Sequence, residues 1–238
     1  MKKFILPSML VYVHLCFVAG LWLFPLQFLV VGILLGLLYN IPCGMFQHRV
    51  VTHKNPVTPF FEKLLIFMSW IRGTGSALGW AGTHRMHHKF SDSDKDPHSP
   101  LIQGVARVYF LSGLFNDPKI IKYVPDLLRN KLMVFQHVHY FKGLLLYHAV
   151  CLIVLPLHWY WLVAIVPSFV AFLAGGLVNS FCHDKDGSKN IVLFALLFGG
   201  EGWHKNHHTD ASSPKFNDSF DAGYTVYRWI SKKQEIIN

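Results

Sequence analysis

The stretch SMLVYVHLCFVAGLWLFPLQFLVVGILLGLLYNIPCGMF, residues 8–46, contains no Asp, Glu, Lys or Arg. A second uncharged stretch, GLLLYHAVCLIVLPLHWYWLVAIVPSFVAFLAGGLVNSFC, occupies residues 143–182. A helix that spans a bilayer needs about 20 apolar residues, so each stretch has room for two spans. Pro25 divides the first stretch, and Pro156 with His158 divides the second. We therefore expect two helical hairpins. Their spans are predicted at about 8–24, 26–46, 143–157 and 159–182.

The composition and the charge distribution agree with an integral membrane protein. Hydrophobic residues make up 52% of the chain and charged residues 15%, whereas soluble domains carry about 25% charged residues. Of the 22 Lys and Arg residues, 2 precede the first stretch, 13 lie between the stretches and 7 follow the second. Because basic segments favour the cytosolic side, we expect 47–142 and 183–238 to form one cytosolic cap. The prediction is a single membrane domain over 1–238.

The net charge of +9 is predicted to face membrane lipids rather than nucleic acid. Anionic lipid headgroups attract basic residues close to the ends of spanning helices. A nucleic-acid-binding protein would carry its basic residues on a separate domain, and the sequence offers none. The four cysteines all lie in the uncharged stretches without a Cys-x-x-Cys pair, which indicates buried, reduced side chains.

Histidine is unusually frequent, with 15 residues, and nine of them fall into spaced groups. The motif THRMHHKF begins at Thr83, and WHKNHHTD begins at Trp203. HRVVTH, 48–53, follows the first uncharged stretch, and His183 follows the second. The other six, which belong to no motif and are expected to pack or hydrogen-bond, are His14, His98, His137, His139, His148 and His158.

The spacing of the nine histidines predicts a site for two metal ions. In each His-x-x-His-His motif, the first and last residues share one helix face, and the middle one points elsewhere. His48 and His53 are about 140° apart on a helix of about 3.6 residues per turn, so they meet only if the helix ends or bends. A closed zinc site takes four ligands, so nine imidazoles suit two ions with four or five each. Imidazole ligands with open positions favour iron, although zinc remains open.

These motifs resemble those of the membrane fatty acyl desaturases, the stearoyl-type family that inserts a cis double bond. The matching stretches are HRVVTH (48–53), THRMHHKFSDSDKDPHSP (83–100), NSFCH (179–183) and GEGWHKNHH (200–208). They follow in the family's order and spacing from about residue 39 to 229. The resemblance implies an all-α integral membrane fold, with four transmembrane helices in two hairpins and a cytosolic helical cap that holds a histidine-rich dimetal site.

The resemblance also implies the ligands, the cofactors and the partners. The ligands would be His48, His53, His84, His87, His88, His183, His204, His207 and His208, with Asn179 acting through water. The cofactors would be two Fe²⁺ ions, with O₂ as co-substrate. The substrate would be a long-chain acyl-CoA or acyl-lipid, desaturated at the delta-9 position. Electrons would come from a separate ferredoxin, or from a b-type cytochrome with its reductase. The membrane would be a bacterial cytoplasmic or ER-type membrane, with the site facing the cytosol.

Two positions differ from the animal acyl-CoA desaturases. Gly82 and Thr83 stand where those proteins carry an Arg-Asp pair, which weakens the case for coenzyme A as the carrier. The third box, with Trp203, is closer to bacterial and plant-type members, some of which act on lipid-bound chains.

Other residues are expected to support the site. Glu201 and Asp96 are predicted to orient ligand imidazoles, while turn formation is the preferred explanation for Asp92 and Asp94. The residues predicted to line a substrate tunnel are Gly32, Gly36, Tyr39, Trp80 and Trp203. For the two glycines, close helix packing is the preferred alternative.

Two other functions remain open at this point. A membrane hydroxylase acting on fatty acyl chains or lipids would use the same histidine boxes. A non-catalytic membrane metal carrier would need polar groups in the middle of its spans, and the two uncharged stretches offer few.

Overall fold

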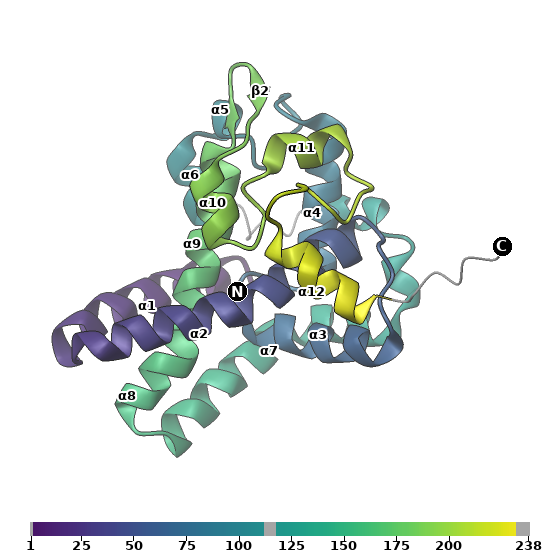
Figure 1. The fold of residues 1–238 in the computed structure, drawn as a ribbon. Coiled ribbons are helices and arrows are strands. Elements are labelled where there is room, and N and C mark those ends of the chain that lie inside the picture. Colours follow the sequence, from purple (N-terminus) through teal and green to yellow (C-terminus); the bar gives the residue numbers. More distant parts are fainter. Residues whose placement is uncertain (1, 112–117, 232–238) are drawn as a thin grey trace.

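The computed structural model describes residues 2–111 and 118–231, and these residues are almost entirely helical (Figure 1). The first hairpin consists of α1 (Lys2–Leu23) and α2 (Leu26–Met45), and Pro25 caps the start of α2. The helix continues from α2 as η1, a π-helix over Phe46–Thr52. The second hairpin consists of α7 (Lys131–Val154), α8 (Leu157–Tyr160), the π-helix η4 (Trp161–Ile165) and α9 (Val166–Phe181).

Three continuous helical stretches are long and apolar enough to cross a membrane: Leu26–Thr52, Lys131–Val154 and Leu157–Phe181. The expected first span corresponds to the shorter apolar helix Met9–Leu23. Helix α7 begins at Lys131. The sequence predicts that this span begins at residue 143. The reason is local, because the side chain of Asn130 accepts hydrogen bonds from the backbone N–H groups of Leu132 and Met133.

The histidine-bearing segments between and after the hairpins form shorter helices. Before α7 these are α3 (Pro59–Ile71), α4 (Ala77–Phe90), α5 (Pro100–Gln103), α6 (Val105–Leu111), η2 (Pro118–Tyr123) and η3 (Leu127–Arg129). After α9 a two-stranded antiparallel hairpin, β1 (His183–Asp184) with β2 (Gly187–Ser188), leads to α10 (Val192–Leu197), α11 (His204–Thr209) and α12 (Ala222–Ile230). The sequence also predicts a short amphipathic helix over 221–233, of which residues 232 and 233 lie outside the described residues.

Two buried clusters hold the fold together. One joins the hairpins, with Tyr160, Trp161 and Ile165 packed against side chains of α1 and α2. The other lies below the histidine helices and includes Phe46, Leu78 and Met133. Figure 1 shows α4 and α11 together on one side of the molecule, while α1, α2, α7 and α8 extend away from them. The histidine helices thus lie beyond one end of the apolar helices.

Candidate metal centre

Four segments that are distant in the sequence bring the nine motif histidines into two adjacent groups. Within each group, the ligand atoms that the residues offer lie within 4.8 Å of one another. The first group contains His48, His53, His84, His88 and His207. The second group contains His87, His183, His204 and His208. The structure therefore divides the nine residues into five and four.

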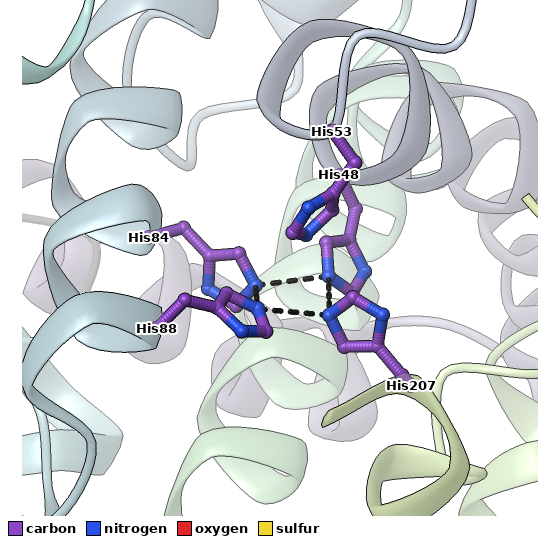
Figure 2. A group of neighbouring side chains, drawn as sticks. All are labelled: His48, His53, His84, His88 and His207. Atoms are coloured by element: carbon purple, nitrogen blue, oxygen red, sulfur yellow. Dashed lines mark hydrogen bonds between the residues drawn. The ribbon is translucent and has the colours of Figure 1, made fainter. Parts of the chain in front are cut away.

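In the first group the imidazole rings point toward a common centre from η1, α4 and α11 (Figure 2). The Nε2 atom of His48 lies 2.9 Å from that of His84 and 2.9 Å from that of His207. The Nε2 atom of His88 lies 3.1 Å from that of His84 and 2.9 Å from that of His207. The ring of His53 completes the group, with its centroid 4.6 Å from that of His207.

The Nε2 atoms of the second group also lie close together. The Nε2 atom of His204 lies 3.0 Å from that of His183 and 3.1 Å from that of His208. The Nε2 atom of His87 lies 3.3 Å from that of His208. His87, His183 and His204 are buried, and His208 is half-buried, so bulk water is largely excluded from both groups.

Helix periodicity explains how each His-x-x-His-His motif serves both groups. On α4, His84 and His88 lie one turn apart and face the first group, while His87 faces the second. On α11 the division is reversed: His204 and His208 face the second group and His207 faces the first. Each of these two helices therefore contributes ligand atoms to both groups.

A π-helix brings His48 and His53 to the same side. The backbone N–H of His53 donates to the carbonyl oxygen of His48 at 3.2 Å, which is the i→i+5 bond of a π-helix. This wider turn places residues five apart above one another, and the two ring centroids are 5.2 Å apart. The sequence indicated that the helix must end or bend between them. It widens instead.

When all four rings are neutral, as metal ligands must be, the four Nε2 contacts of the first group cannot all be hydrogen bonds. A neutral imidazole carries a single N–H, and in a neutral His48 that hydrogen is on Nδ1, which donates to the carboxylate of Glu201. At most three hydrogens remain for the four contacts that join His48, His84, His88 and His207 in a ring. At least one pair of nitrogens therefore meets with lone pairs only, as ligands of a metal ion do.

The distances also fit a metal ion of high coordination number. Nitrogens about 2.1 Å from one ion are about 3.0 Å apart at a ligand angle of 90°, and about 3.4 Å apart at the tetrahedral angle. The contacts in the first group, from 2.9 to 3.1 Å, match the right angle. Both groups consist of imidazole alone, which suits iron, zinc, copper or nickel. The site is thus compatible with the two iron ions that the sequence predicts.

The protonation of the histidines fits metal binding as well. Burial, reinforced by the neighbouring imidazoles, lowers the pKa of His88 to about 2 and that of His208 to about 3. The same causes lower the pKa values of His53, His84, His87, His204 and His207. These rings are therefore neutral at physiological pH, and the neutral ring is the form that binds metals.

Three carboxylates accept hydrogen bonds from Nδ1 of candidate ligands, the ring nitrogen that faces away from the other histidines of the group. Nδ1 of His87 donates to Asp96, and Nδ1 of His183 donates to Asp92, each at 2.8 Å. Glu201 accepts from Nδ1 of His48 in the same way. Burial opposes the ionisation of Glu201, but His48 and Arg49 lower its pKa to about 2, so it is a carboxylate. Glu201 and Asp96, which the sequence predicts to orient ligand imidazoles, each accept from one of these histidines.

Asp92 was expected to serve turn formation, and the structure gives it a second role. Its backbone lies in the left-handed region (φ 59°), which Asp tolerates better than most residues. In this conformation one carboxylate oxygen accepts from Ser99 and the other from His183. The sequence offered no signal for this contact, because His183 is 91 residues away.

We predict that Asp92→Asn lowers metal affinity by about 10–100-fold, because carboxylates that orient ligand histidines have effects of that size. The measurement is a chelator titration of the purified protein that follows metal content. Asp94→Asn is the matched control, since Asp94 is an exposed residue of the same loop and should leave the affinity unchanged. Equal affinities for the two variants would contradict the orienting role.

His98 also lies at the site, although no motif marked it. Its ring is 4.3 Å from that of His87 between centroids, and with His87 and Asp96 it forms a third possible ligand cluster. Its backbone N–H donates to Asp96 at 3.0 Å. Neither ring nitrogen of His98 has a hydrogen-bond partner among the described residues. His98 lies within the stretch 83–100 that matches the family motifs, although its spacing from the other histidines does not predict this contact.

An apolar cavity reaches the first histidine group. Its walls come from α2, α9 and the end of α10, with residues such as Ile41, Ala174 and Phe198. His48 and His84 line the end near the candidate metal centre. The resulting space is suited to an alkyl chain that lies beside the first group.

The residues predicted for a tunnel are distributed over different environments. Trp80 lines this cavity and stacks on His84, with 4.7 Å between ring centroids, and Asn179 lines it too. Tyr39 lines a separate cavity between α2 and α9 and donates to the carbonyl of Met68. The indole of Trp203 donates to the carbonyl of Phe220 at 2.7 Å, away from the cavity lining.

Gly32 and Gly36 lie where α2 crosses α9. A Cβ on Gly32 would be 3.1 Å from Val166, and one on Gly36 would be 3.0 Å from Val170. Neither glycine lines the cavity beside the histidines. The structure therefore favours helix packing over a tunnel role for these two residues.

Comparison with known proteins identifies relatives of the chain. The model of the fatty acid desaturase family matches residues 20–217. The chain is 31% identical to the Delta-9 desaturase-like 2 protein of Arabidopsis thaliana over 202 residues, which cover 77% of this chain and 66% of that protein. The match thus spans about two thirds of the Arabidopsis protein.

Two other relatives carry more specific names. The chain is 32% identical to an acyl-CoA 5-desaturase of Anemone leveillei over 229 residues, which cover 82% of this chain and 68% of that protein. It is 26% identical to a hex-5-enoyl-[acyl-carrier protein] acetylenase of Moorena producens (strain JHB) over 250 residues, which cover 90% of this chain and 78% of that protein.

Proposed function

The chain belongs to the fatty acid desaturase family, and from this premise we propose that it is a membrane enzyme that introduces a cis double bond into a fatty acyl chain. The observation that carries the proposal is the pair of converging imidazole groups at the end of an apolar cavity. A substrate chain in this cavity would lie next to His48 and His84, which belong to the first group.

We propose that the two groups hold two iron ions. The first group would hold one ion through five imidazoles and the second group the other through four, with Asn179 acting through a water molecule. When bound, the ions together with O₂ and two electrons supply an oxidant strong enough to take hydrogen from unactivated methylene carbons. No side chain of the protein can remove such hydrogens as an acid or a base.

The protein's own contribution is positioning. The cavity holds the acyl chain so that one carbon pair stays near the histidines, which replaces a random encounter by a fixed geometry. Asp92, Asp96 and Glu201 accept from Nδ1 and so fix the tautomer and the orientation of these imidazoles. Burial of the histidines keeps water away from the reacting carbons.

The finer assignments extend this proposal. The name of the Arabidopsis relative supports delta-9 as the position of the new bond. The acyl-CoA, acyl-lipid and acyl-carrier-protein forms of the substrate remain distinct options. We propose four spans, with Met9–Leu23 as the fourth, and one domain whose cap faces the cytosol. A ferredoxin or a b-type cytochrome would dock on this cap to deliver electrons.

We expect expression of this chain in a host that lacks its own desaturase to produce an unsaturated fatty acid that the empty-vector host lacks. Gas chromatography of the total lipids, with mass spectrometry of derivatised double bonds, gives the position. A hydroxylated acyl product instead would assign the chain to the hydroxylases. An unchanged lipid profile, with the protein present in the membrane and loaded with metal, would contradict an acyl-modifying function and favour a metal carrier.

A further inference from the structure

Beside the histidines, the mostly apolar cavity contains a buried positive charge, and Glu201, the carboxylate that lines the same cavity, forms no ion pair with it. Arg72, at the C-terminal end of α3, lines the cavity and is 7% exposed. Its Nε donates to the side-chain oxygen of Asn40 at 2.9 Å, and its Nη1 donates to that of Gln47. Both acceptors are neutral amides. Among the described residues, Arg72 forms no ion pair.

The remaining donors of Arg72 are left without a partner. A guanidinium has five N–H groups, and Nη2 makes no hydrogen bond with any described residue. This nitrogen lies 3.4 Å from the point that a Cβ on Gly44 would occupy, so the missing side chain at Gly44 leaves it accessible from the cavity. Gly44 precedes His48 by four residues, which is about 6 Å along the helix axis. The free donors are therefore close to the first histidine group.

A second polar group in the same cavity also lacks a partner. Thr74 is 7% exposed and lines the cavity with Arg72. Its hydroxyl is buried and makes no hydrogen bond in the described part of the chain. A buried hydroxyl without a partner costs about 1–3 kcal/mol. An alkyl chain in the cavity offers no partner to Thr74 or Arg72, whereas an oxygen atom on that chain offers one.

We propose that Arg72 and Thr74 form a polar subsite that binds an oxygen atom of the acyl substrate inside the cavity. The oxygen is an uncharged acceptor, either a hydroxyl on the chain or the carbonyl of the acyl group itself. The subsite deepens the proposed function and rests on it, because it assumes an acyl substrate. It predicts a preference for chains whose oxygen lies at one distance from the reacting carbons.

Binding measured without turnover tests the subsite. The purified chain, without reductant, is loaded with a fluorescent fatty acid, which is then displaced by octadecane, which carries no oxygen atom, and by a positional series of octadecanols. A second series contains thioesters of saturated acids of increasing length. The first series detects a hydroxyl on the chain, and the second detects the acyl carbonyl. We expect one position or one length to bind about tenfold more tightly than its neighbours, as a charge-assisted hydrogen bond would produce.

Arg72→Met and Thr74→Val should abolish this preference and leave the binding of octadecane, which carries no oxygen atom, unchanged. Arg228→Met and Thr225→Val are the matched controls, because both residues are exposed on α12, and these variants should keep the preference. Thr74→Val preserves the side-chain shape. If Arg72→Met does not fold, the binding preference is therefore measured on Thr74→Val alone.

Equal binding across both series, or a preference that survives in Arg72→Met or Thr74→Val, would overturn the subsite. If desaturation is nevertheless observed, only the subsite fails. If no acyl ligand displaces the probe, the subsite and the proposed acyl substrate both fail. If a preference is found but no unsaturated product forms, the subsite stands and the proposed reaction fails.

Discussion

The double variant His87→Ala/His207→Ala is expected to lose all measurable desaturation and most of its bound metal. His207 belongs to the first histidine group and His87 to the second, so the variant removes one ligand candidate from each. Loss of a residue that merely orients a ligand already lowers affinity or activity by about 10–100-fold. Loss of a ligand at both ions should therefore reduce product by more than about 100-fold. Iron per chain by mass spectrometry and acyl products by gas chromatography measure the two effects.

His139→Ala is the matched control, because His139 lies on α7 outside both groups. Its metal content and product yield should equal those of the unchanged protein. The single variants add a stricter test: each should lower the affinity of one site more than that of the other. Normal activity in the double variant, with normal folding, would contradict the proposal that the two groups hold the ions used in the reaction.

The division of the histidine motifs between the two groups was predictable from the sequence. Residues four apart on a helix share a face, and this rule alone separates His84 and His88 from His87. The same rule separates His207 from its neighbours on α11. It cannot show that α4 and α11 meet, because their contact depends on the tertiary fold. The number of spaced histidines predicted one site for two ions, and the resemblance to a known family supported the same convergence of four distant segments.

Two features of the site escaped sequence reasoning for physical reasons. The π-helical turn after Met45 is a backbone feature, seen in the bond from His53 to His48, and no residue type specifies such a turn. The bond between Asp92 and His183 joins a loop to the end of α9. From the sequence, an Asp-rich loop is first interpreted as a turn, because turn formation needs only local contacts.

For the spanning helices, the sequence located the hairpins but not the start of one helix. The uncharged stretches located both hairpins, and Pro25 and Pro156 marked where each one turns. The start of α7 was placed too late because Lys142 was taken as the end of the apolar run. A helix continues through a single lysine without difficulty, and its true beginning is set by the cap at Asn130.

Arg49→Met is expected to lower the free energy of unfolding by about 3–5 kcal/mol, the usual effect of breaking a buried ion pair. The side chain of Arg49 is fully buried. Nη1 donates to Asp221 at 2.8 Å and to the carbonyl of Pro214 at 2.7 Å, and Nη2 donates to Glu201 at 3.2 Å. The guanidinium also lies 3.7 Å from the ring centroid of Phe216. One side chain thus joins η1 to the segment that follows α11.

The variant would leave Asp221, whose side chain is 2% exposed, as a buried charge without its partner. Glu201 contacts both His48 and Arg49. Without Arg49 its carboxylate would hold His48 less firmly, so metal affinity should fall together with stability. Denaturant unfolding in detergent, followed by circular dichroism, measures the first effect, and metal content measures the second. Arg129→Met, at an exposed arginine of η3, should change neither.

A double-mutant cycle separates the ion pair from simple loss of packing. If the unpaired Asp221 carboxylate causes most of the loss, Asp221→Asn should destabilise the Arg49→Met background much less than it destabilises the unchanged protein. Additive effects would instead assign the loss to packing against Phe216. Full stability of Arg49→Met would show that the segment after α11 is held by other contacts. The position of His207 beside His48 would then not depend on this arginine.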